Sequence, residues 1–152
     1  MTTDDHEIRT DLADMDLDLV HEWLSTDAYW SLGRTRAAVG TAAEHSLNFG
    51  AFTSDGRQVA YARVVTDHAN FAWLCDVYVD RDHRGRGLGR RLVDECIRFA
   101  REKRYRKLVL WTQSDLDAAR AIYRSCGFKL AKSEKHASFG TRLTGEYWEL
   151  RL

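Results

Sequence analysis

The sequence contains no proline, and it shows no internal repeat, no low-complexity tract and no linker rich in glycine or serine. Such segments are where chains usually divide, so nothing marks a boundary between domains. A chain of 152 residues buries roughly 70% of its unfolded surface on folding, which is enough for a core of its own. We therefore expect residues 1–152 to form a single domain.

The sequence also lacks an excess of charge and a long apolar run. Its 23 basic and 23 acidic residues balance, so no global field draws the chain to nucleic acid or to an anionic membrane. No apolar run approaches the ~20 residues that span a bilayer, and residues 1–7 are polar and acidic, unlike a secretory leader. We expect a cytoplasmic protein that binds neither nucleic acid nor membrane.

Cysteine is scarce, with only Cys75, Cys96 and Cys126. Their spacing fits no metal-binding pattern, and an odd number leaves at least one thiol unpaired. This usage favours reduced, buried thiols over a disulfide framework, in agreement with a cytosolic location. We expect no metal ion in the functional site.

What the sequence does contain is a run of alternating glycines near its centre. Residues 70–80 before it are rich in aromatic and β-branched side chains and predict a strand. After it, apolar residues recur at helical spacing from residue 88 to residue 100. The run between them, called the glycine loop below, consists of Arg84, Gly85, Arg86, Gly87, Leu88, Gly89 and Arg90.

The glycine loop has the chemistry of a phosphate-binding site. Glycine removes the side chains that keep a ligand from the backbone, and it allows dihedral angles at which successive N–H groups point to one side. The following helix adds its unpaired first-turn donors and the positive end of its dipole, and Arg84, Arg86 and Arg90 add charge. The spacing matches neither a P-loop nor a dinucleotide fingerprint. The alternative is a tight surface turn that needs glycine for its own geometry.

Periodicity in the rest of the chain predicts an α/β protein with a mixed sheet. Three consecutive strands predict an antiparallel meander, whereas the strand–helix–strand connection through the glycine loop predicts a parallel pair. A mobile loop is expected between the last two strands. The predicted elements are strand 7–12, helix 16–30, helix 35–46, strands 47–53, 58–66 and 71–79, the helix after the glycine loop, strand 107–112, helix 116–126, and strands 128–133 and 146–152, with the mobile loop at 134–145.

Two motifs in this order resemble those of one enzyme superfamily. Arg84, Gly87 and Gly89 match the Arg-x-x-Gly-x-Gly pyrophosphate motif of the GNAT superfamily (GCN5-related N-acetyltransferases), which are acyl-CoA-dependent N-acyltransferases. Residues 121–128 resemble the Leu-Tyr-x-x-x-Gly-Phe signature of that family, with Tyr123 as its tyrosine. The resemblance implies the GNAT fold, an α/β architecture with a mixed, mostly antiparallel central sheet of about seven strands flanked by about four helices.

The resemblance also implies acetyl-CoA (coenzyme A) as co-substrate, with its pyrophosphate bound to the glycine loop. It places the pantetheine arm against the backbone of Val77 and Val79, with the N–H of Val77 polarising the thioester carbonyl. It further implies that Tyr123 faces the CoA sulfur, where a hydrogen bond helps the thiolate to leave. The alternative for Tyr123 is a core residue packed beneath the sheet.

The acceptor amine needs a base, because an alkylammonium has a pKa near ~10.4 and is almost wholly protonated at neutral pH. Asp76 is the carboxylate nearest to the expected thioester, and it is our candidate general base. The alternative is a carboxylate that is hydrogen-bonded to the backbone. Asp67, His68 and Glu146 are weaker candidates, placed only by their position near strand ends.

One position departs from the family pattern. Many relatives carry an asparagine seven residues before the tyrosine to hold the pantetheine, but this chain has Leu116 there, between Asp115 and Asp117. Either aspartate is a candidate to replace the asparagine. Asp115 fits the helix N-cap better, which leaves Asp117 as the candidate cofactor ligand.

Acceptor recognition in the resembling family comes from the first helices and from the late hairpin, which includes residues 134–145. Tyr29, Trp30 and Arg34 form an aromatic and cationic cluster in the first of these regions, and Arg34 suits a carboxylate on the acceptor. The alternative is that Trp23 and Trp30, seven residues apart, share a stripe that faces the core.

These observations predict an enzyme that moves an acetyl group from acetyl-CoA to a primary amine of a small molecule or peptide by direct attack in a ternary complex. A thiol relay is disfavoured, because no histidine is placed in sequence to activate Cys75 or Cys126. Two alternatives stay open: a CoA-binding regulatory or interaction module without turnover, and an enzyme that acylates charged tRNA. Balanced charge weakens the second. A homodimer is a further possibility, by analogy with relatives only.

Overall fold

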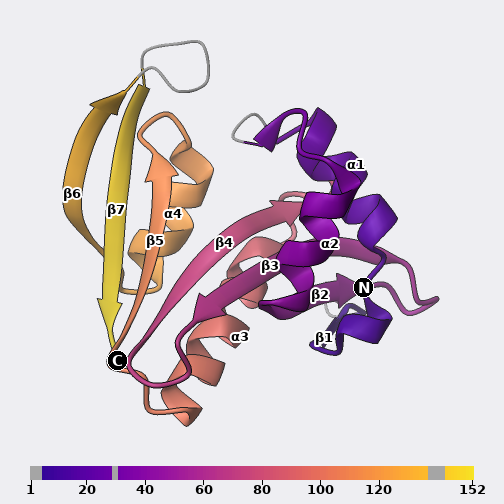
Figure 1. Ribbon diagram of the computed structural model, residues 1–152, viewed down its shortest axis with the longest axis horizontal. Coiled ribbons are helices and arrows are strands. Elements are labelled where there is room, and N and C mark those ends of the chain that lie inside the picture. The colour runs from indigo at the N-terminus through magenta and orange to yellow at the C-terminus, as the bar shows by residue number, and fades with distance from the viewer. Residues whose placement is uncertain (1–4, 29–30, 137–142) are drawn as a thin grey trace.

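The computed structural model describes residues 5–28, 31–136 and 143–152 of the chain. Within these residues, strands form one sheet and α-helices cover both of its faces (Figure 1). The elements are β1 (Glu7–Arg9), α1 (Leu17–Thr26), α2 (Arg36–Glu44), β2 (Leu47–Phe52), β3 (Gln58–Thr66), β4 (Phe71–Val79), α3 (Leu88–Glu102), β5 (Lys107–Gln113), α4 (Asp117–Ser125), β6 (Lys129–His136) and β7 (Leu143–Arg151), with short 3-10 helices at Leu12–Asp14 and Arg81–His83.

The sheet has seven strands in the order β1-β2-β3-β4-β5-β7-β6. Every neighbouring pair is antiparallel except β4 and β5, which are parallel and are connected through α3. The predicted meander is β2-β3-β4, so the mixed, mostly antiparallel sheet is confirmed. None of the helices formed by the described residues is long and apolar enough to cross a membrane.

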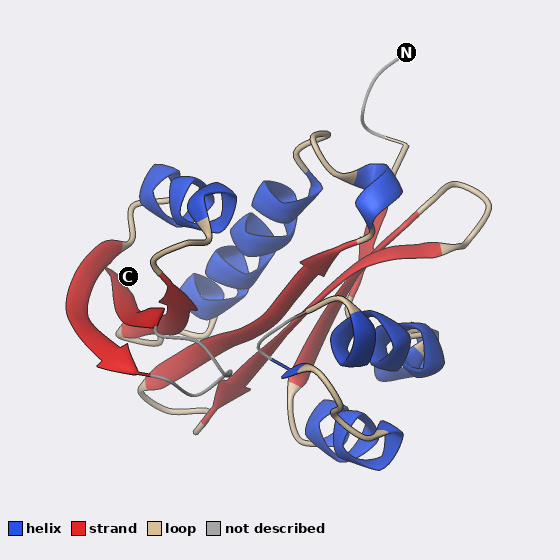
Figure 2. Cartoon of the chain, turned by 90° about the horizontal axis from the view of Figure 1, so that it is seen from above, coloured by secondary structure: helices blue, strands red, loops and turns tan. Residues whose placement is uncertain are grey.

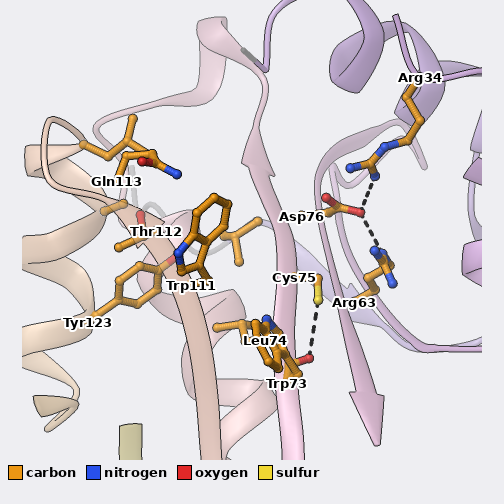
Figure 3. Close-up of a pocket in the computed structure, with 13 residues that line it drawn as sticks. Arg34, Arg63, Trp73, Leu74, Cys75, Asp76, Trp111, Thr112, Gln113 and Tyr123 are labelled. Carbon is orange, nitrogen blue, oxygen red and sulfur yellow. Dashed lines mark hydrogen bonds and ion pairs between the residues drawn. The ribbon is translucent and has the colours of Figure 1, made fainter. Parts of the chain in front are cut away.

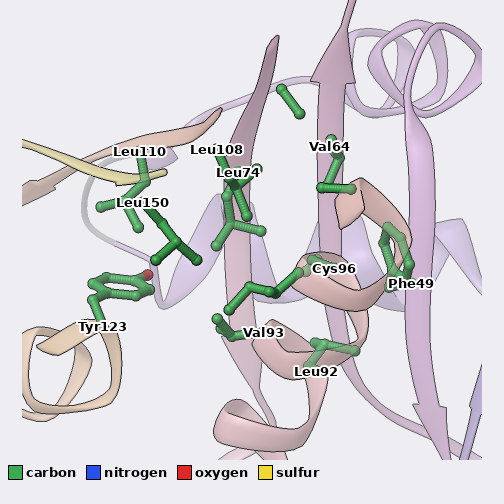
Figure 4. Close-up of a cluster of buried hydrophobic side chains, with 14 of the residues drawn as sticks. Phe49, Val64, Leu74, Leu92, Val93, Cys96, Leu108, Leu110, Tyr123 and Leu150 are labelled. Carbon is green, nitrogen blue, oxygen red and sulfur yellow. The ribbon is translucent and has the colours of Figure 1, made fainter. Parts of the chain in front are cut away.

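Two hydrophobic clusters hold the layers together. Figure 2 shows α1 and α2 on one face of the sheet and α3 and α4 on the other. Leu92, Val93 and Cys96 of α3 recur at helical spacing, so one stripe of that helix packs on Leu74 and Leu108 of the central strands (Figure 4).

On the opposite face, helix α1 contributes the second cluster. Val20, Trp23 and Leu24 are buried against Tyr61 of β3 and Tyr78 of β4. The Trp23 and Tyr78 rings stack with centroids 5.3 Å apart. This packing fixes the C-terminal end of α1 beside the C-terminal half of β4.

The parallel pair β4–β5 separates halfway along its length. Its register runs only from Phe71 opposite Lys107 to Leu74 opposite Leu110, although β4 continues to Val79. A bulge in β4 coincides with the separation, because the register against β3 shifts there and Asp76 adopts a φ of 52°. Bulges bend a strand and increase its twist. The two strands therefore diverge toward their C-terminal ends, as Figure 1 shows.

Several predicted boundaries are wrong, and the first strand, for example, ends at Arg9 instead of residue 12. Helix α1 ends at Thr26 instead of continuing to residue 30, because the chain turns back on itself: the N–H of Gly33, with a φ of 78°, bonds to the carbonyl of Ser25. At its described residues, 134–136 and 143–145, the predicted mobile loop is strand, and residues 137–142 of that prediction lie outside the described residues. Pairs such as Glu134–Gly145 continue the β6–β7 ladder.

Candidate functional site

The glycine loop follows β4 and the short 3-10 helix at Arg81–His83, and its last three residues form the start of α3. Gly85 and Gly87 both have a φ of 79°, a left-handed conformation that side-chain-bearing residues rarely adopt. Gly87 is the N-cap of α3, and its carbonyl accepts the first hydrogen bond of the helix, from the N–H of Arg91 at 3.0 Å. The N–H groups in the first turn of α3 therefore have no partner within the helix and remain available to a ligand.

The three glycines serve different purposes. A Cβ at Gly85 or Gly87 meets nothing within 4 Å, so backbone conformation, not crowding, requires glycine there. A Cβ at Gly89 lies 3.2 Å from Ile122 of α4, so this glycine lets the two helices approach. The open space around Gly87, beside unpaired amides and the positive end of α3, fits an anion such as a phosphate.

A large cavity of about 670 Å³ extends from the glycine loop along the end of β4 to α4. Most of the residues that the sequence predicted as cofactor ligands line it, and Arg86 is the exception. Those that line it are Val77, Val79, Arg84, Gly85, Gly87, Leu88, Gly89, Arg90 and Asp117.

A cluster around Asp27, which the sequence did not predict, holds Arg84 at the mouth of this cavity. Asp27 follows α1 and accepts hydrogen bonds from Tyr78, Arg81 and Arg84, the last at 3.1 Å. These hydrogen bonds, above all the one from Arg81, lower the pKa of the Asp27 carboxyl group well below its usual range. Arg84 also donates to the carbonyl of Val79 at 2.9 Å. Its charge is therefore directed partly at the protein.

A smaller cavity of about 270 Å³ lies on the other side of the divergence between β4 and β5 (Figure 3). Four residues line both cavities: Val77, Leu116, Ala119 and Tyr123. The remaining described residues around the small cavity are Arg34, Arg63, Trp73, Leu74, Cys75, Asp76, Trp111, Thr112 and Gln113. The two cavities therefore meet at Val77 and Tyr123.

Tyr123 belongs to the core and to the site at once. Its side chain on α4 is 7% exposed, and its ring packs edge-on against Phe128 with centroids 5.8 Å apart. Burial raises the pKa of Tyr123 above its ordinary value. The phenol is therefore protonated at neutral pH and can donate a hydrogen bond at the junction of the cavities.

Asp76 is held by two arginines that are distant in sequence. One of its oxygens, Oδ2, accepts a bond from Arg34 Nη1 and another from Arg63 Nε, each at 2.7 Å. Burial opposes the charge of the carboxylate, but the two guanidinium groups, Arg63 foremost, outweigh burial and lower its pKa. A carboxylate with a lowered pKa is a weak base. This geometry gives no support to the predicted role of Asp76 as general base.

The weaker base candidates have other partners. Asp67 accepts bonds from the backbone N–H groups of residues 69–71, at the end of β4 that is remote from Val77. Glu146 is buried and accepts bonds from Arg120 at 2.9 Å and Trp148 at 3.2 Å. His68, with a φ of 62°, lies in the same β3–β4 turn as Asp67.

The start of α4 differs from the prediction. Its N-cap is Leu116, with no hydrogen bond from the capping side chain, so the assignment of Asp115 as N-cap is wrong. Asp117 is the first residue of the helix and lines the large cavity. The half-buried, apolar Leu116 thus stands where the family pattern has an asparagine, and it lines both cavities.

The acceptor candidates fall into two groups. Tyr29 and Trp30 lie outside the described residues. Arg34 lines the small cavity with a side chain that is 24% exposed. Trp23 is a core residue, as the alternative for that stripe requires.

All three cysteines are free thiols. Cys96 is fully buried, whereas Cys75 and Cys126 are half-buried, so the expectation of buried thiols is correct only for Cys96. Burial raises the pKa of Cys75 to about 11 and also raises that of Cys126. Protonated thiols are poor nucleophiles, so these values disfavour a relay. Among the described residues, no cluster of His, Cys, Asp or Glu could hold a metal ion.

The fold and the site together define an α/β protein with a glycine loop next to a pair of parallel strands that diverge. Residues 17–128 match the model of the acetyltransferase (GNAT) family. The chain belongs to this family, and its GNAT fold is confirmed.

Relatives agree with this assignment. The chain is 30% identical to human N-acetyltransferase 8B over 125 residues, which are 82% of this chain and 48% of that protein. Across this and two further curated relatives, the matched part of the chain spans 25% to 60% of their length.

Solved structures show the same fold. A protein from Xanthomonas campestris pv. campestris, assigned to the GNAT family, is 40% identical, with a TM-score of 0.70 over 78% of this chain and 82% of that one. A protein from Salmonella typhimurium, solved with its cofactor acetyl-CoA, is 21% identical, with a TM-score of 0.79 over 98% of this chain and 95% of that one.

Proposed function

We propose that this protein is an N-acetyltransferase that moves an acetyl group from acetyl-CoA to a primary amine of a small molecule or peptide, by direct attack in a ternary complex. The observation that carries this proposal is the meeting of two cavities at Val77 and Tyr123, where β4 and β5 diverge. Membership of the GNAT family and the Salmonella structure with acetyl-CoA support it.

The large cavity takes the CoA part of the co-substrate in this proposal. The amides of the glycine loop and the N-terminus of α3 bind its pyrophosphate. Because Gly87 has no side chain, the space beside its backbone is open to the pyrophosphate. Asp117 and the backbone of Val79 line the path toward Tyr123. The thioester supplies the activated acyl group.

The backbone of β4 polarises the thioester carbonyl. Pairing with β5 ends at Leu74, so β5 does not use the N–H of Val77. A fixed backbone donor at this position stabilises the negative charge that develops on the carbonyl oxygen during attack. The bulge at Asp76 directs this segment away from β5.

Tyr123 acts on the sulfur as a hydrogen-bond donor. With ordinary pKa values of ~10 for tyrosine and ~8.5 for a thiol, full transfer of its proton is uphill by about 2 kcal/mol. Burial of Tyr123 raises its pKa and makes full transfer costlier still. Tyr123 therefore keeps its proton. The amine nitrogen forms a bond to the acyl carbon, the carbon–sulfur bond breaks, and a proton released by the amine ends on the sulfur.

Calorimetry with acetyl-CoA and CoA, followed by a screen of amines for thiol release, tests this function. Micromolar binding of acetyl-CoA with amine-dependent release is the expected result. Binding without release from any amine would instead favour a CoA-binding module, and release only with aminoacyl-tRNA would favour the tRNA-directed alternative. An absence of binding would overturn the assignment of the glycine loop.

A further inference from the structure

The small cavity carries an excess of positive charge. Its charged residues within the described part of the chain are Arg34, Arg63 and Asp76, whereas the other described lining residues are neutral. Two guanidinium groups against one carboxylate leave a net charge of +1. An uncompensated guanidinium beside a small, partly apolar cavity is a binding site for an anionic group.

These arginines are held in place before any ligand arrives. The backbone carbonyl of Arg34 accepts a bond from the His21 ring at 3.0 Å, and its N–H bonds to the carbonyl of Ser31 at 3.0 Å. Arg63 bonds to Ser46 at 3.2 Å as well as to Asp76. Preorganised groups lose little conformational freedom on binding.

Asp76 orients both guanidinium groups but accepts a hydrogen bond from only one nitrogen of each. Its Oδ2 takes Nη1 of Arg34 and Nε of Arg63, and their side chains are 24% and 16% exposed. Arginine has five N–H donors in a planar fork. Donors of both residues are left over after the bonds described, and neither side chain has a nitrogen that is buried without a partner.

The two arginines with Asp76, and Tyr123, lie on opposite sides of the small cavity. Figure 3 shows Arg34, Asp76 and Arg63 on one side, Tyr123 on the other, and the Trp73 and Trp111 rings between them. An amine that reacts beside Tyr123 therefore has its far end near the arginines. The section in between is aromatic and suits an apolar spacer.

We propose that the acceptor is an amino carboxylate, with its amine at Tyr123, an apolar spacer against Trp73 and Trp111, and its carboxylate bound by Arg34 and Arg63. This proposal rests on the acyl transfer proposed above. Because the cavity has a volume of about 270 Å³, we specify a free small molecule as the acceptor. In this arrangement Asp76 is a positioning residue that keeps both guanidinium groups at the cavity.

The test compares amines that differ only in charge at the far end. A homologous series of linear ω-amino carboxylates and 4-(aminomethyl)benzoate are each assayed with acetyl-CoA for thiol release, against the matching carboxamides. At least one carboxylate is expected to exceed its carboxamide by about tenfold in kcat/KM, mainly through KM. Arg34→Gln should remove most of this difference, and Arg34→Lys should restore part of it.

Two further measurements keep the proposal falsifiable. Arg98→Gln, on the exposed side of α3, is the control and should keep the full difference. Quenching of tryptophan fluorescence by the same acids and amides measures binding without turnover, because Trp73 and Trp111 line the cavity. Arg63→Gln serves as a second variant if Arg34→Gln does not fold.

The outcomes distinguish the amino carboxylate proposal from the acyl transfer on which it rests. Turnover of amines with no preference for a carboxylate in either assay would overturn the amino carboxylate and leave the acyltransferase intact. Turnover of peptides with acidic residues, but of no free amino carboxylate, would also overturn it. Carboxylate-selective quenching without any thiol release would support the anion site and contradict the proposed reaction.

Discussion

At the scale of single residues, Tyr123 combines burial with a place at the junction of two cavities. Tyr123→Phe removes only the hydroxyl, so the ring still packs on Phe128. We expect kcat to fall by about one to two orders of magnitude, because the departing sulfur loses a hydrogen bond, while the Kd of acetyl-CoA changes by less than about twofold. Steady-state thiol release and calorimetry measure the two quantities.

Tyr105→Phe is the matched control for this substitution. Tyr105 is also buried, at 4% exposed, but it packs against Phe99 and lines neither of the two cavities. Its variant should keep the wild-type kcat. Equal activities of the wild type and Tyr123→Phe would remove Tyr123 from the mechanism.

The ion pairs of Asp76 predict how stability depends on pH. The folded-state pKa of Asp76 is lowered, so its pairs contribute stability above the unfolded pKa of ~3.9, and this stability is lost as the pH falls through the folded value. Asp76→Asn should therefore show a smaller loss of unfolding free energy than the wild type when the pH drops from about 5 into that range. Urea titrations at a series of pH values measure this slope.

Asp18→Asn is the control, since Asp18 pairs with Arg36 on the surface and its side chain is 88% exposed. Exposed pairs contribute little, so its slope should match the wild type. A slope of Asp76→Asn equal to that of the wild type would mean that the folded state does not lower the pKa of Asp76.

The sequence identified Asp76 and Arg34 separately but could not show that they are partners. Arg34 follows α1 and Asp76 lies 42 positions later, in a strand bulge. No local pattern reports such a contact, because it depends on how α1 packs on β4. Arg63 and Asp27 were missed for the same reason: each is one charged residue among many until the fold supplies its neighbours.

At the scale of elements, the left-handed glycines of the loop allow a direct test. Gly87→Ala places a Cβ on a backbone with a φ of 79°, which costs about 1–2 kcal/mol of stability. It also adds a methyl group where we propose that a phosphate binds, so the affinity for acetyl-CoA should fall by about tenfold or more. Urea unfolding and calorimetry measure these effects separately.

Gly56→Ala isolates the strain. Gly56 has a φ of 88° in the β2–β3 turn, and its Cβ would also meet nothing within 4 Å. We expect a similar loss of stability with unchanged affinity for acetyl-CoA. Parallel losses of affinity in both variants would show that strain, rather than the proposed phosphate contact, is responsible.

Elements with a strong apolar period were predicted well from the sequence, and polar ones were not. Strands β3 and β4 have the predicted bounds, since both are rich in apolar residues and lie in the middle of a sheet that is covered on both faces. Strand β6 was cut short because its residues are exposed on both faces at the edge of the sheet, where no hydrophobic alternation marks a strand. The bulge at Asp76 left no signal either.

At the scale of the whole molecule, Asp27 connects the helical layer of α1 to the glycine loop. It partly neutralises Arg81 and Arg84 at the mouth of the large cavity. Asp27→Asn should therefore tighten acetyl-CoA binding by about threefold at low ionic strength, because more positive charge faces the polyanion, and the gain should shrink as salt is added. Calorimetry across a salt series checks both.

Glu95→Gln provides the comparison, because Glu95 pairs with Arg98 at 2.8 Å on α3 and neither residue lines the large cavity. Its effect on affinity should be smaller than that of Asp27→Asn. Weaker binding by Asp27→Asn would show that this carboxylate orients Arg84 for the ligand instead of withholding it.

The four residues common to both cavities have a consequence for inhibition. A single compound that reaches from the glycine loop past Tyr123 to Arg34 would fill both cavities across that shared wall. It would lose its translational and rotational freedom once, where two separate ligands lose theirs twice. A CoA conjugate that ends in a carboxylate should therefore bind more tightly than either half, in proportion to how well its tether matches the passage at Val77.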